Sequence, residues 1–398
     1  MLTTTTGPSA LRAAGGRTWL PISRGAAALQ HRCLSTSSAY RAAHIISFGE
    51  TSTPELSQVL DDYREKVILP TYLSQEQRRK IYNPRIKHIL QNDPITMEID
   101  GVVHKFRYRS MVADLPSTRG TLRQIISLLK TPADFQNIPP FLEGCVRARR
   151  KIEPVDYIRL VRLAALNGQL QMIIDCVKAA DKTGFKLDNS HVINELLAYI
   201  QRPAILGGFD EAKTKAALKQ VRLVLNILES DEEHHRPEAK TAGAFPYYRD
   251  PQVLGARLHM AAARAVHHRG GKDEDGRVAR YAEELVALWP ENAGLLDLQP
   301  DRAYRKRDGI MRYMLDRNTY LFMASPVLNG LTLAAQVVDP ALAMQLQNRA
   351  DAVDSEVKAA LASPLRKKGG RGEQLYNAIF NPQAQAEEAE YREREEAA

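Results

Sequence analysis

The sequence predicts an all-α protein, built as an α-solenoid of helix pairs, with a short N-terminal arm that contains one β-hairpin. Three observations support this fold class. From Leu115 onward, segments of about 12–20 residues carry apolar side chains at helical spacing. Gly, Pro or Asn stands at most joints between these segments. Only one pair of alternating runs, on either side of Asp100-Gly101, predicts strands.

Residues 1–41 have the composition of a mitochondrial transit peptide. They contain five arginines and no lysine, and the first acidic residue of the chain is Glu50. The stretch Arg32-Cys33-Leu34-Ser35 resembles a matrix-processing site with Arg at the minus-two position, and a later trim near Arg41 is a second option. We therefore expect import into the mitochondrial matrix and removal of this segment.

Residues 42–114 predict an arm rather than a repeat. Thr53-Pro54-Glu55 has a capping residue, a proline and an acid in the order that begins a helix, which should end before Pro70. Ser74 to Gln77 form a capping-box pattern that opens a second helix, ended by Pro84. The runs 95–99 and 102–108 flank Asp100-Gly101, a pair that favours a two-residue hairpin turn.

Residues 115–363 predict a helical-repeat domain. The expected helices are 117–130, 132–149, 154–167, 169–183, 189–201, 209–229, 250–268, 276–288, 302–323, 326–337, 339–348 and 351–362. Helix pairs of this length that recur without strands are typical of an α-solenoid. Residues 364–398 predict a flexible tail that is first basic and then acidic.

One helix pair carries a family resemblance. Residues 154–188 span 35 positions, with Tyr157 near the start, Asn167-Gly168 between the helices, and Gly184 and Asp188 at the end. This stretch resembles a pentatricopeptide repeat, and the chain resembles a mitochondrial protein of that kind, including a fungal-type mitoribosome component. The resemblance implies that the first helices line an RNA-facing surface and that the fifth and last positions read a base. Ile158 at the fifth position cannot hydrogen-bond a base, although Asp188 matches the last.

The composition and motifs exclude several classes of protein. The chain has 398 residues, 44% of them hydrophobic and 26% charged, and its three cysteines are too few for a disulfide scaffold. No phosphate-binding loop, dinucleotide fingerprint or paired metal-ligand motif occurs, so we expect no catalytic residue, cofactor, metal or small-molecule substrate. We expect Cys145 and Cys176 to be buried. Residues 318–338 carry no charge, but Pro326 and Gly330 interrupt them, so we expect a buried helix junction and no integral membrane insertion.

Clusters of basic residues are the candidate RNA-binding sites. The net charge is +8, of which residues 1–41 supply five positive charges, so a mature chain starting at Ala42 retains +3. Cationic side chains neutralise phosphates, and interleaved aromatic residues, here Tyr82, Phe106, Tyr108, Tyr304 and Tyr313, can stack on bases. We expect Lys105, Arg107 and Arg109 to share one face of the hairpin. The candidates form three groups along the chain. The first is Arg78, Arg79, Lys80, Arg85, Lys87, Lys105, Arg107 and Arg109, the second is Arg147, Arg149, Arg150, Lys151, Arg159 and Arg162, and the third is Arg305, Lys306 and Arg307.

These observations predict a non-enzymatic RNA-binding protein of mitochondrial translation. A structural component of the mitochondrial ribosome is the first interpretation, with ribosomal RNA rather than messenger RNA, and mitoribosomal proteins, as partners. Ribosomal proteins grip RNA through dispersed basic patches without reading its sequence. Two alternatives stay open: a pentatricopeptide-type factor for transcript maturation or translation activation, and an assembly scaffold for a respiratory complex.

Overall fold

The computed structural model describes residues 45–99, 101–236, 245–363 and 369–383. The expected transit peptide, the basic residues Arg366 to Lys368 and the acidic end of the chain lie outside these ranges. In the described part, helices dominate and one antiparallel hairpin is present, as predicted.

The arm contains short helices followed by the hairpin. Its elements are α1 (Pro54–Tyr63), the π-helical turn η1 (Arg64–Ile68), the 3-10 turns η2 (Leu69–Tyr72) and η3 (Pro84–Ile86), α2 (Gln75–Ile81), α3 (Lys87–Asn92), β1 (Ile95–Ile99) and β2 (Val102–Phe106). The predicted starts are confirmed, because Thr53 caps α1 and Ser74 forms a capping box with Gln77. The strands pair with Ile95 opposite Phe106 and Ile99 opposite Val102.

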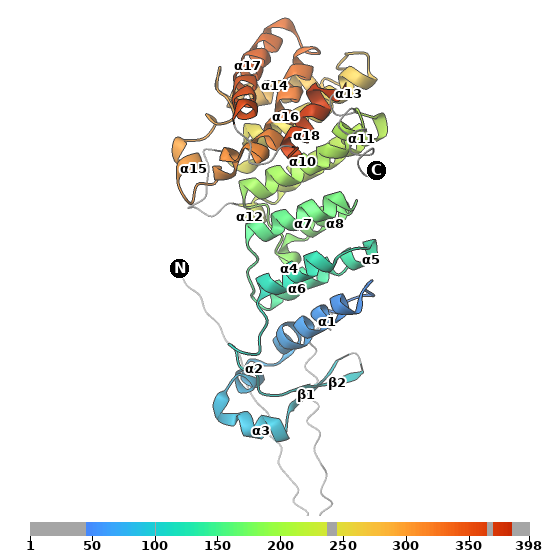
Figure 1. The fold of residues 1–398 in the computed structure, drawn as a ribbon, viewed down its shortest axis with the longest axis vertical. Helices are drawn as coiled ribbons and strands as arrows, with labels where there is room; N and C mark the ends of the chain where they lie inside the picture. Colours follow the sequence, from blue (N-terminus) through green and yellow to red (C-terminus); the bar gives the residue numbers. More distant parts are fainter. Residues whose placement is uncertain (1–44, 100, 237–244, 364–368, 384–398) are drawn as a thin grey trace, which may run out of the picture. The chain divides into compact units, whose positions relative to one another are not determined.

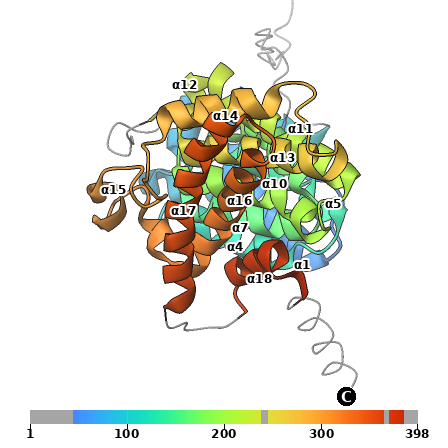
Figure 2. The same ribbon diagram turned by 90° about the horizontal axis from the view of Figure 1, so that it is seen from above.

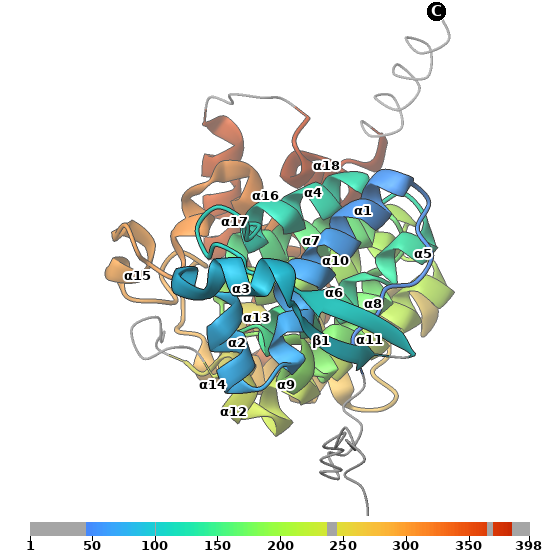
Figure 3. The same cartoon turned by 90° about the horizontal axis from the view of Figure 1, so that it is seen from below.

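The arm has a small hydrophobic core of its own. Its buried members are Leu69, Leu73, Ile81, Leu90, Ile99 and Phe106. Tyr72 packs against this small core and also against the main core of the protein. Figure 3 shows α2, α3 and β1 lying beside one another in this region.

The helices after the arm form one large core. They are α4 (Thr118–Leu128), α5 (Pro132–Phe135), α6 (Ile138–Arg147), α7 (Pro154–Leu166), α8 (Leu170–Lys178), α9 (Ala180–Thr183), α10 (Ser190–Leu206), α11 (Glu211–Ser230), α12 (Glu232–His235), α13 (Pro251–His268), α14 (Arg277–Leu288), α15 (Asp301–Arg305), α16 (Arg317–Ala335), α17 (Pro340–Ala362) and α18 (Arg371–Phe380), with 3-10 turns η4 (Tyr247–Arg249) and η5 (Arg312–Leu315).

Successive helices are stacked in tiers (Figure 1). Helix α1 packs on α4, α4 packs on α7, and α7 packs on α10. Beside this row, α6 contacts η1 and α9, while α11 packs against α10. The side chains that face one another across the tiers belong to the same continuous core.

Helix α16 is the centre of the C-terminal half. It packs against α13, α17 and α18, and Figure 2 shows these helices around it. The approach to α13 is close at Gly330, where an added Cβ would stand 2.7 Å from the Cβ of His259. A glycine is therefore required for this helix crossing.

Two of the expected helices are interrupted, because a proline pair or an aspartate cap begins a new helix inside the expected range. The expected helix 132–149 is two helices, because Pro139 and Pro140 have no N–H to continue α5 and instead open α6. The expected helix 302–323 is broken: Asp316 caps α16, and Gly309 brings the chain back against Ala303. The backbone N–H of Met311 donates to the carbonyl of Ala303 (2.9 Å).

Other helices are longer than expected. Pro326 lies inside α16 and does not begin a new helix, and Pro203 lies inside α10, which continues to Leu206. The expected helices 339–348 and 351–362 are one helix, α17. In α10 and α16, tertiary packing against several neighbours compensates for the hydrogen bond that the internal proline cannot make. Helix α18 lies in the segment that was expected to be a flexible tail.

Candidate RNA interface

The first group of predicted cations is exposed on the arm. Arg78, Arg79 and Lys80 form the last turn of α2, and Lys80 pairs with Glu76 at 2.8 Å. Arg85 and Lys87 follow in η3 and α3 and are also exposed, with the Lys87 ammonium 5.6 Å from the centre of the Tyr108 ring. This segment therefore presents five cations to solvent.

The hairpin does not present its cations as expected. Lys105 lies in β2, but Arg107 and Arg109 lie beyond the end of that strand, so the three side chains do not share one strand face. Arg109 turns back toward η1, where it donates to the carbonyl (2.7 Å) and the carboxylate of Glu65. Phe106 is buried in the small core and is not available to stack on a base.

Arginines from three separate segments lie near Tyr82: Arg78 and Arg150 line a cavity with it, and the N–H of Arg109 donates to the carbonyl of the preceding residue, Ile81 (2.9 Å). Burial raises the pKa of the Tyr82 hydroxyl, and the positive charges of Arg109, Arg150 and Arg78 oppose that rise. A cavity of about 260 Å³ lies here, and Arg78, Tyr82, Arg149 and Arg150 are among its lining residues. The fold thus joins cations of α2, the end of the hairpin and the joint between α6 and α7.

The backbone at this joint is unusual. Arg149 has φ of 54°, in the left-handed region that favours glycine, and the N–H of Arg150 donates to the carbonyl of Cys145 (2.8 Å). This left-handed helix end costs on the order of 1 kcal/mol for a non-glycine residue. It turns the chain so that consecutive arginines line the cavity.

A second hollow lies on the other side of Arg150. Its volume is about 450 Å³, and its lining includes Arg150, Lys151, Lys186 and Asn189. Tyr157 forms part of the wall and donates from its hydroxyl to the carbonyl of Gly184 (2.9 Å). Arg150 therefore belongs to both hollows. Arg147 is the last residue of α6, where it stacks on Tyr72 at 3.8 Å and donates to Thr71 (3.0 Å).

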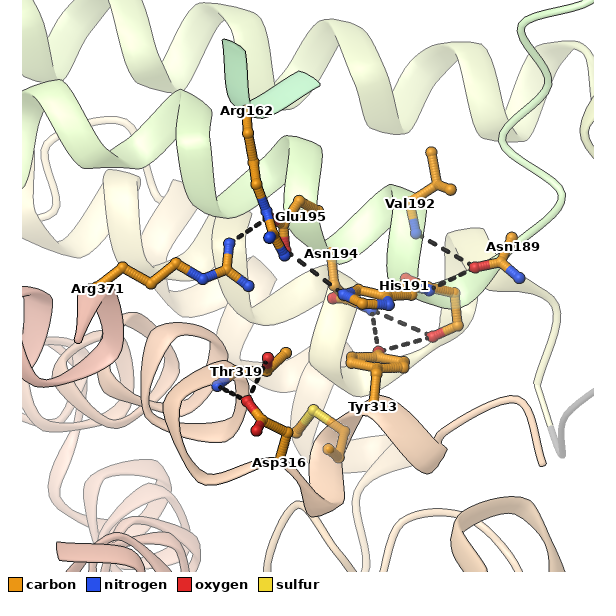
Figure 4. Close-up of polar contacts among 12 residues, drawn as sticks. Arg162, Asn189, His191, Val192, Asn194, Glu195, Tyr313, Asp316, Thr319 and Arg371 are labelled. Atoms are coloured by element: carbon orange, nitrogen blue, oxygen red, sulfur yellow. Dashed lines mark hydrogen bonds and ion pairs between the residues drawn. The ribbon is translucent and has the colours of Figure 1, made fainter. Parts of the chain in front are cut away.

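Arg159 and Arg162 are separate from this group. Both lie on α7, where Arg159 is 3.7 Å from the buried carboxylate of Asp156 and Arg162 is 2.5 Å from that of Glu195 (Figure 4). Three further arginines, Arg119, Arg123 and Arg371, join the same two carboxylates. The sequence analysis missed Arg119 and Arg123, although their four-residue spacing places both on one face of α4, and it assigned Arg371 to the basic part of a flexible tail.

The third predicted group is exposed but lacks free aromatic rings. Arg305, Lys306 and Arg307 are exposed at the end of α15, and Arg305 pairs with Asp301 at 2.5 Å. Tyr304 is buried and donates to the carbonyl of Leu295 (2.8 Å). The Tyr313 ring stacks on His191 with centroids 4.2 Å apart. The expectation that these two tyrosines interleave with the cations at a surface is wrong.

The apolar residues singled out in the sequence are in the core. Ile158 is 6% exposed, and Cys145 and Cys176 are each 1% exposed, as predicted for the cysteines. Burial raises the pKa of both thiols to about 12, so they stay protonated at neutral pH. In the described ranges, no three His, Cys, Asp or Glu side chains are grouped so that they could hold a metal ion.

The comparison with protein families decides the assignment. The family model described as mitochondrial ribosomal protein mS27 matches residues 32–378 of this chain. The chain therefore belongs to the mitochondrial ribosomal protein mS27 family. A relative in Neurospora crassa, the small ribosomal subunit protein mS27, is 39% identical over 370 residues, which cover 88% of this chain and 93% of the relative. Membership in the mS27 family confirms the prediction of a mitochondrial ribosomal protein.

The mS27 match extends over the arm, over the helices from α4 to α17 and over most of α18. The stretch 318–338 forms the buried part of α16 and the turn after it. Within the described ranges, none of the helices combines the length and the apolar composition needed to cross a bilayer.

Proposed function

We propose that this protein is a non-enzymatic structural component of the small subunit of the mitochondrial ribosome, where it grips ribosomal RNA by its phosphates. The main supporting observation is the cavity that Arg78, Arg149 and Arg150 line together with Tyr82, although they come from two separate segments. A cationic hollow assembled by the fold is a ready site for a phosphodiester backbone. Support for the subunit comes from the name of the Neurospora crassa relative.

The contacts favour phosphate binding over base readout. Guanidinium groups match phosphate oxygens with two parallel hydrogen bonds. Ile158, the position that would read a base, is packed in the core and has no polar side-chain atom. Phosphate contacts fix the register of a protein on RNA but carry no sequence information. The RNA partner is therefore ribosomal RNA, held wherever its backbone fits, rather than a messenger RNA chosen by its sequence.

We also propose that the tiers of helices form an α-solenoid and that residues 154–188 are one pentatricopeptide-like repeat within it. Helices α7 and α8 pack on each other across Gly168, which has φ of 70°. Gly184 has φ of 66° and ends α9, and Tyr157 reaches back to its carbonyl. These features match the pair of helices and the two glycine turns of such a repeat.

The proposed site of action is the mitochondrial matrix. The support is the acid-free, arginine-rich composition of residues 1–41. N-terminal sequencing of the protein purified from mitochondria should give a start between Cys33 and Ala42. A purified protein that still begins at Met1 would contradict import by a cleaved presequence.

Sedimentation of a mitochondrial lysate on a density gradient tests the proposed function. We expect the protein to travel with the small subunit, both in intact ribosomes and after the subunits are separated by removal of Mg²⁺, and to resist moderate salt. Recovery only in light fractions under gentle lysis would contradict the proposal. Recovery with a messenger RNA or with a respiratory-complex intermediate would support the transcript-factor or scaffold alternative instead.

A further inference from the structure

Two buried carboxylates each gather a set of arginines on one side of the helical tiers. Asp156 on α7 is 1% exposed, and its oxygens are 3.3 Å from Arg119 and Arg123 of α4 and 3.7 Å from Arg159. The arginine side chains remain 53%, 41% and 46% exposed. The anion is thus inside the protein and the cations are outside.

Glu195 repeats this arrangement one tier further on. It lies on α10 with no exposed surface, and one of its oxygens accepts hydrogen bonds from Arg162 of α7 and Arg371 of α18 (Figure 4). The Nε2 atom of His191 is 3.6 Å from the other carboxylate oxygen. Arg371 also lies over the ring of Phe322 at 4.5 Å, which fixes its guanidinium.

The two sets are continuous through α7. Arg159 and Arg162 are three residues apart, so they lie on the same face of this helix, and α7 contacts both α4 and α10. Five guanidinium groups face two carboxylates, which leaves an excess of three positive charges. We call these five residues the arginine layer: Arg119, Arg123, Arg159, Arg162 and Arg371.

We propose that the arginine layer is a second RNA-binding surface, which holds a phosphodiester backbone across α4, α7 and α18. Each guanidinium has five N–H donors, and the carboxylates beneath use only some of them. The buried carboxylates hold the guanidiniums in place before binding, so less conformational entropy is lost when a phosphate arrives. This inference rests on the proposed function and adds a site that is distinct from the hollows around Arg150.

An acidic protein segment is the other occupant that such a layer could attract. Phosphate is favoured because the cations come from three helices, α4, α7 and α18, and form a spread surface rather than one pocket. A backbone with a charge on every nucleotide matches such a surface, whereas carboxylates in a peptide are irregularly spaced. The experiment below includes both ligands.

The test uses the full chain with Arg119→Gln and Arg159→Gln together. This pair leaves Arg123 on Asp156, so the buried carboxylate keeps a partner. Binding is measured by fluorescence anisotropy with short single-stranded RNAs of two unrelated sequences and with oligoglutamate, over a range of salt. Two lost phosphate contacts should lower the slope of log binding constant against log salt concentration by about 1.4. This corresponds to binding that is weaker by roughly 25-fold at about 0.1 M salt, equally for both RNAs.

Lys215→Gln with Lys219→Gln is the matched control. These exposed lysines on α11 carry the same charge but lie outside the arginine layer, so RNA binding should change far less. Arg119→Lys with Arg159→Lys should restore most of the salt slope. Unfolding midpoints that match the wild type show that the variants are folded.

Two results would overturn the inference. If the arginine pair and the lysine pair of substitutions weaken RNA binding equally, the loss reflects only the lower net charge of the protein and not a site at the arginine layer. Loss of oligoglutamate binding with unchanged RNA binding would assign the layer to an acidic protein. Either result leaves the proposed function intact if the wild-type protein still sediments with the small subunit, whereas failure to sediment contradicts the proposed function itself.

Discussion

Arg371 and Glu195 are 176 residues apart in the chain, yet the guanidinium of the first donates to the buried carboxylate of the second. The same carboxylate oxygen accepts from Arg162 at 2.5 Å. Gly372 follows Arg371 and lies so close to α16 that an added Cβ would meet the backbone of Asn318 and Phe322. The C-terminal helix α18 is thereby fixed to two earlier helices by an ion pair and by close packing.

Glu195→Gln should reduce stability and change its pH dependence. Burial raises the pKa of Glu195, but the hydrogen bonds and charges of Arg371 and Arg162, with His191 3.6 Å from the second oxygen, outweigh it and lower the pKa from 4.5 to about 2. The carboxylate therefore contributes stability above pH 4.5 that is lost as the pH falls toward 2, on the order of 3 kcal/mol. Urea unfolding of wild type and variant across this range measures the difference. Parallel pH profiles would contradict this assignment.

Asp250→Asn should have the opposite pH signature. Complete burial raises the pKa of Asp250 from 3.8 to about 6, against the hydrogen bonds from Gln252 and Gln299. The folded protein holds this proton more tightly than the unfolded chain, so its contribution is full below pH 3.8 and lost as the pH rises through 6. The wild type should lose about 3 kcal/mol over this window relative to the variant.

Asparagine also suits the helix N-cap that Asp250 provides for α13, which keeps the comparison clean. Urea unfolding between pH 4 and 7 gives the two curves. A constant difference between them would show that Asp250 does not take up a proton in the folded state.

Gly330→Ala should be more destabilising than Gly255→Ala. At Gly330 an added Cβ would stand 2.7 Å from the Cβ of His259. His259 cannot move away, because it belongs to the buried helix α13. At Gly255 the nearest atoms are methyl groups of Val327 at 3.3 Å. We expect a loss of about 2 kcal/mol for Gly330→Ala. For Gly255→Ala we expect a near-neutral result, since alanine favours a helix by about 1 kcal/mol. Denaturant midpoints rank the two, and equal losses would contradict the close crossing.

Replacing Arg149, Arg150 and Lys151 by alanine should weaken RNA binding about equally for unrelated sequences. Each lost phosphate contact lowers the slope of log affinity against log salt by about 0.7 on single-stranded RNA. Alanine at position 149 adds no new strain, because arginine already holds the left-handed φ of 54°. Anisotropy titrations at several salt concentrations measure this. Unchanged affinity at low salt would remove the hollow around Arg150 from the RNA interface.

Ile158→Asn is the companion test of sequence readout. Ile158 is 6% exposed, so an amide there should lower stability by about 3 kcal/mol and leave the relative affinity for different RNAs unchanged. A variant that stays folded and binds one sequence selectively would contradict the phosphate-grip interpretation.

Local signals in the sequence predicted the helices and the hairpin, because caps, prolines and periodicity act within a few residues. Thr53, Ser74 and the Asp100-Gly101 pair gave correct boundaries for this reason. Pro203 and Pro326 misled, since packing on several sides holds a helix together through a missing hydrogen bond. Helix α18 was missed because its anchor, Glu195, is far away in the sequence.

The candidate site could be predicted only residue by residue. The sequence identified Arg78, Arg109 and Arg150 as cations, but their meeting around Tyr82 depends on how α2 packs near the end of α6. It also placed Arg159 and Arg162 in one group with Arg150, whereas α7 carries them to a different surface. Contacts between residues that are far apart in the chain produce no periodic pattern in the sequence from which they could be predicted.

Because the arm has a separate small core, two regions of the protein differ in the free energy that local unfolding costs. Six buried apolar residues hold α2, α3 and the hairpin together, while the remaining helices share one far larger core. Local opening of a small unit costs less free energy than global unfolding. The segment from α2 to β2 can therefore lose and regain its structure while the helices of the main core, α1 included, stay folded.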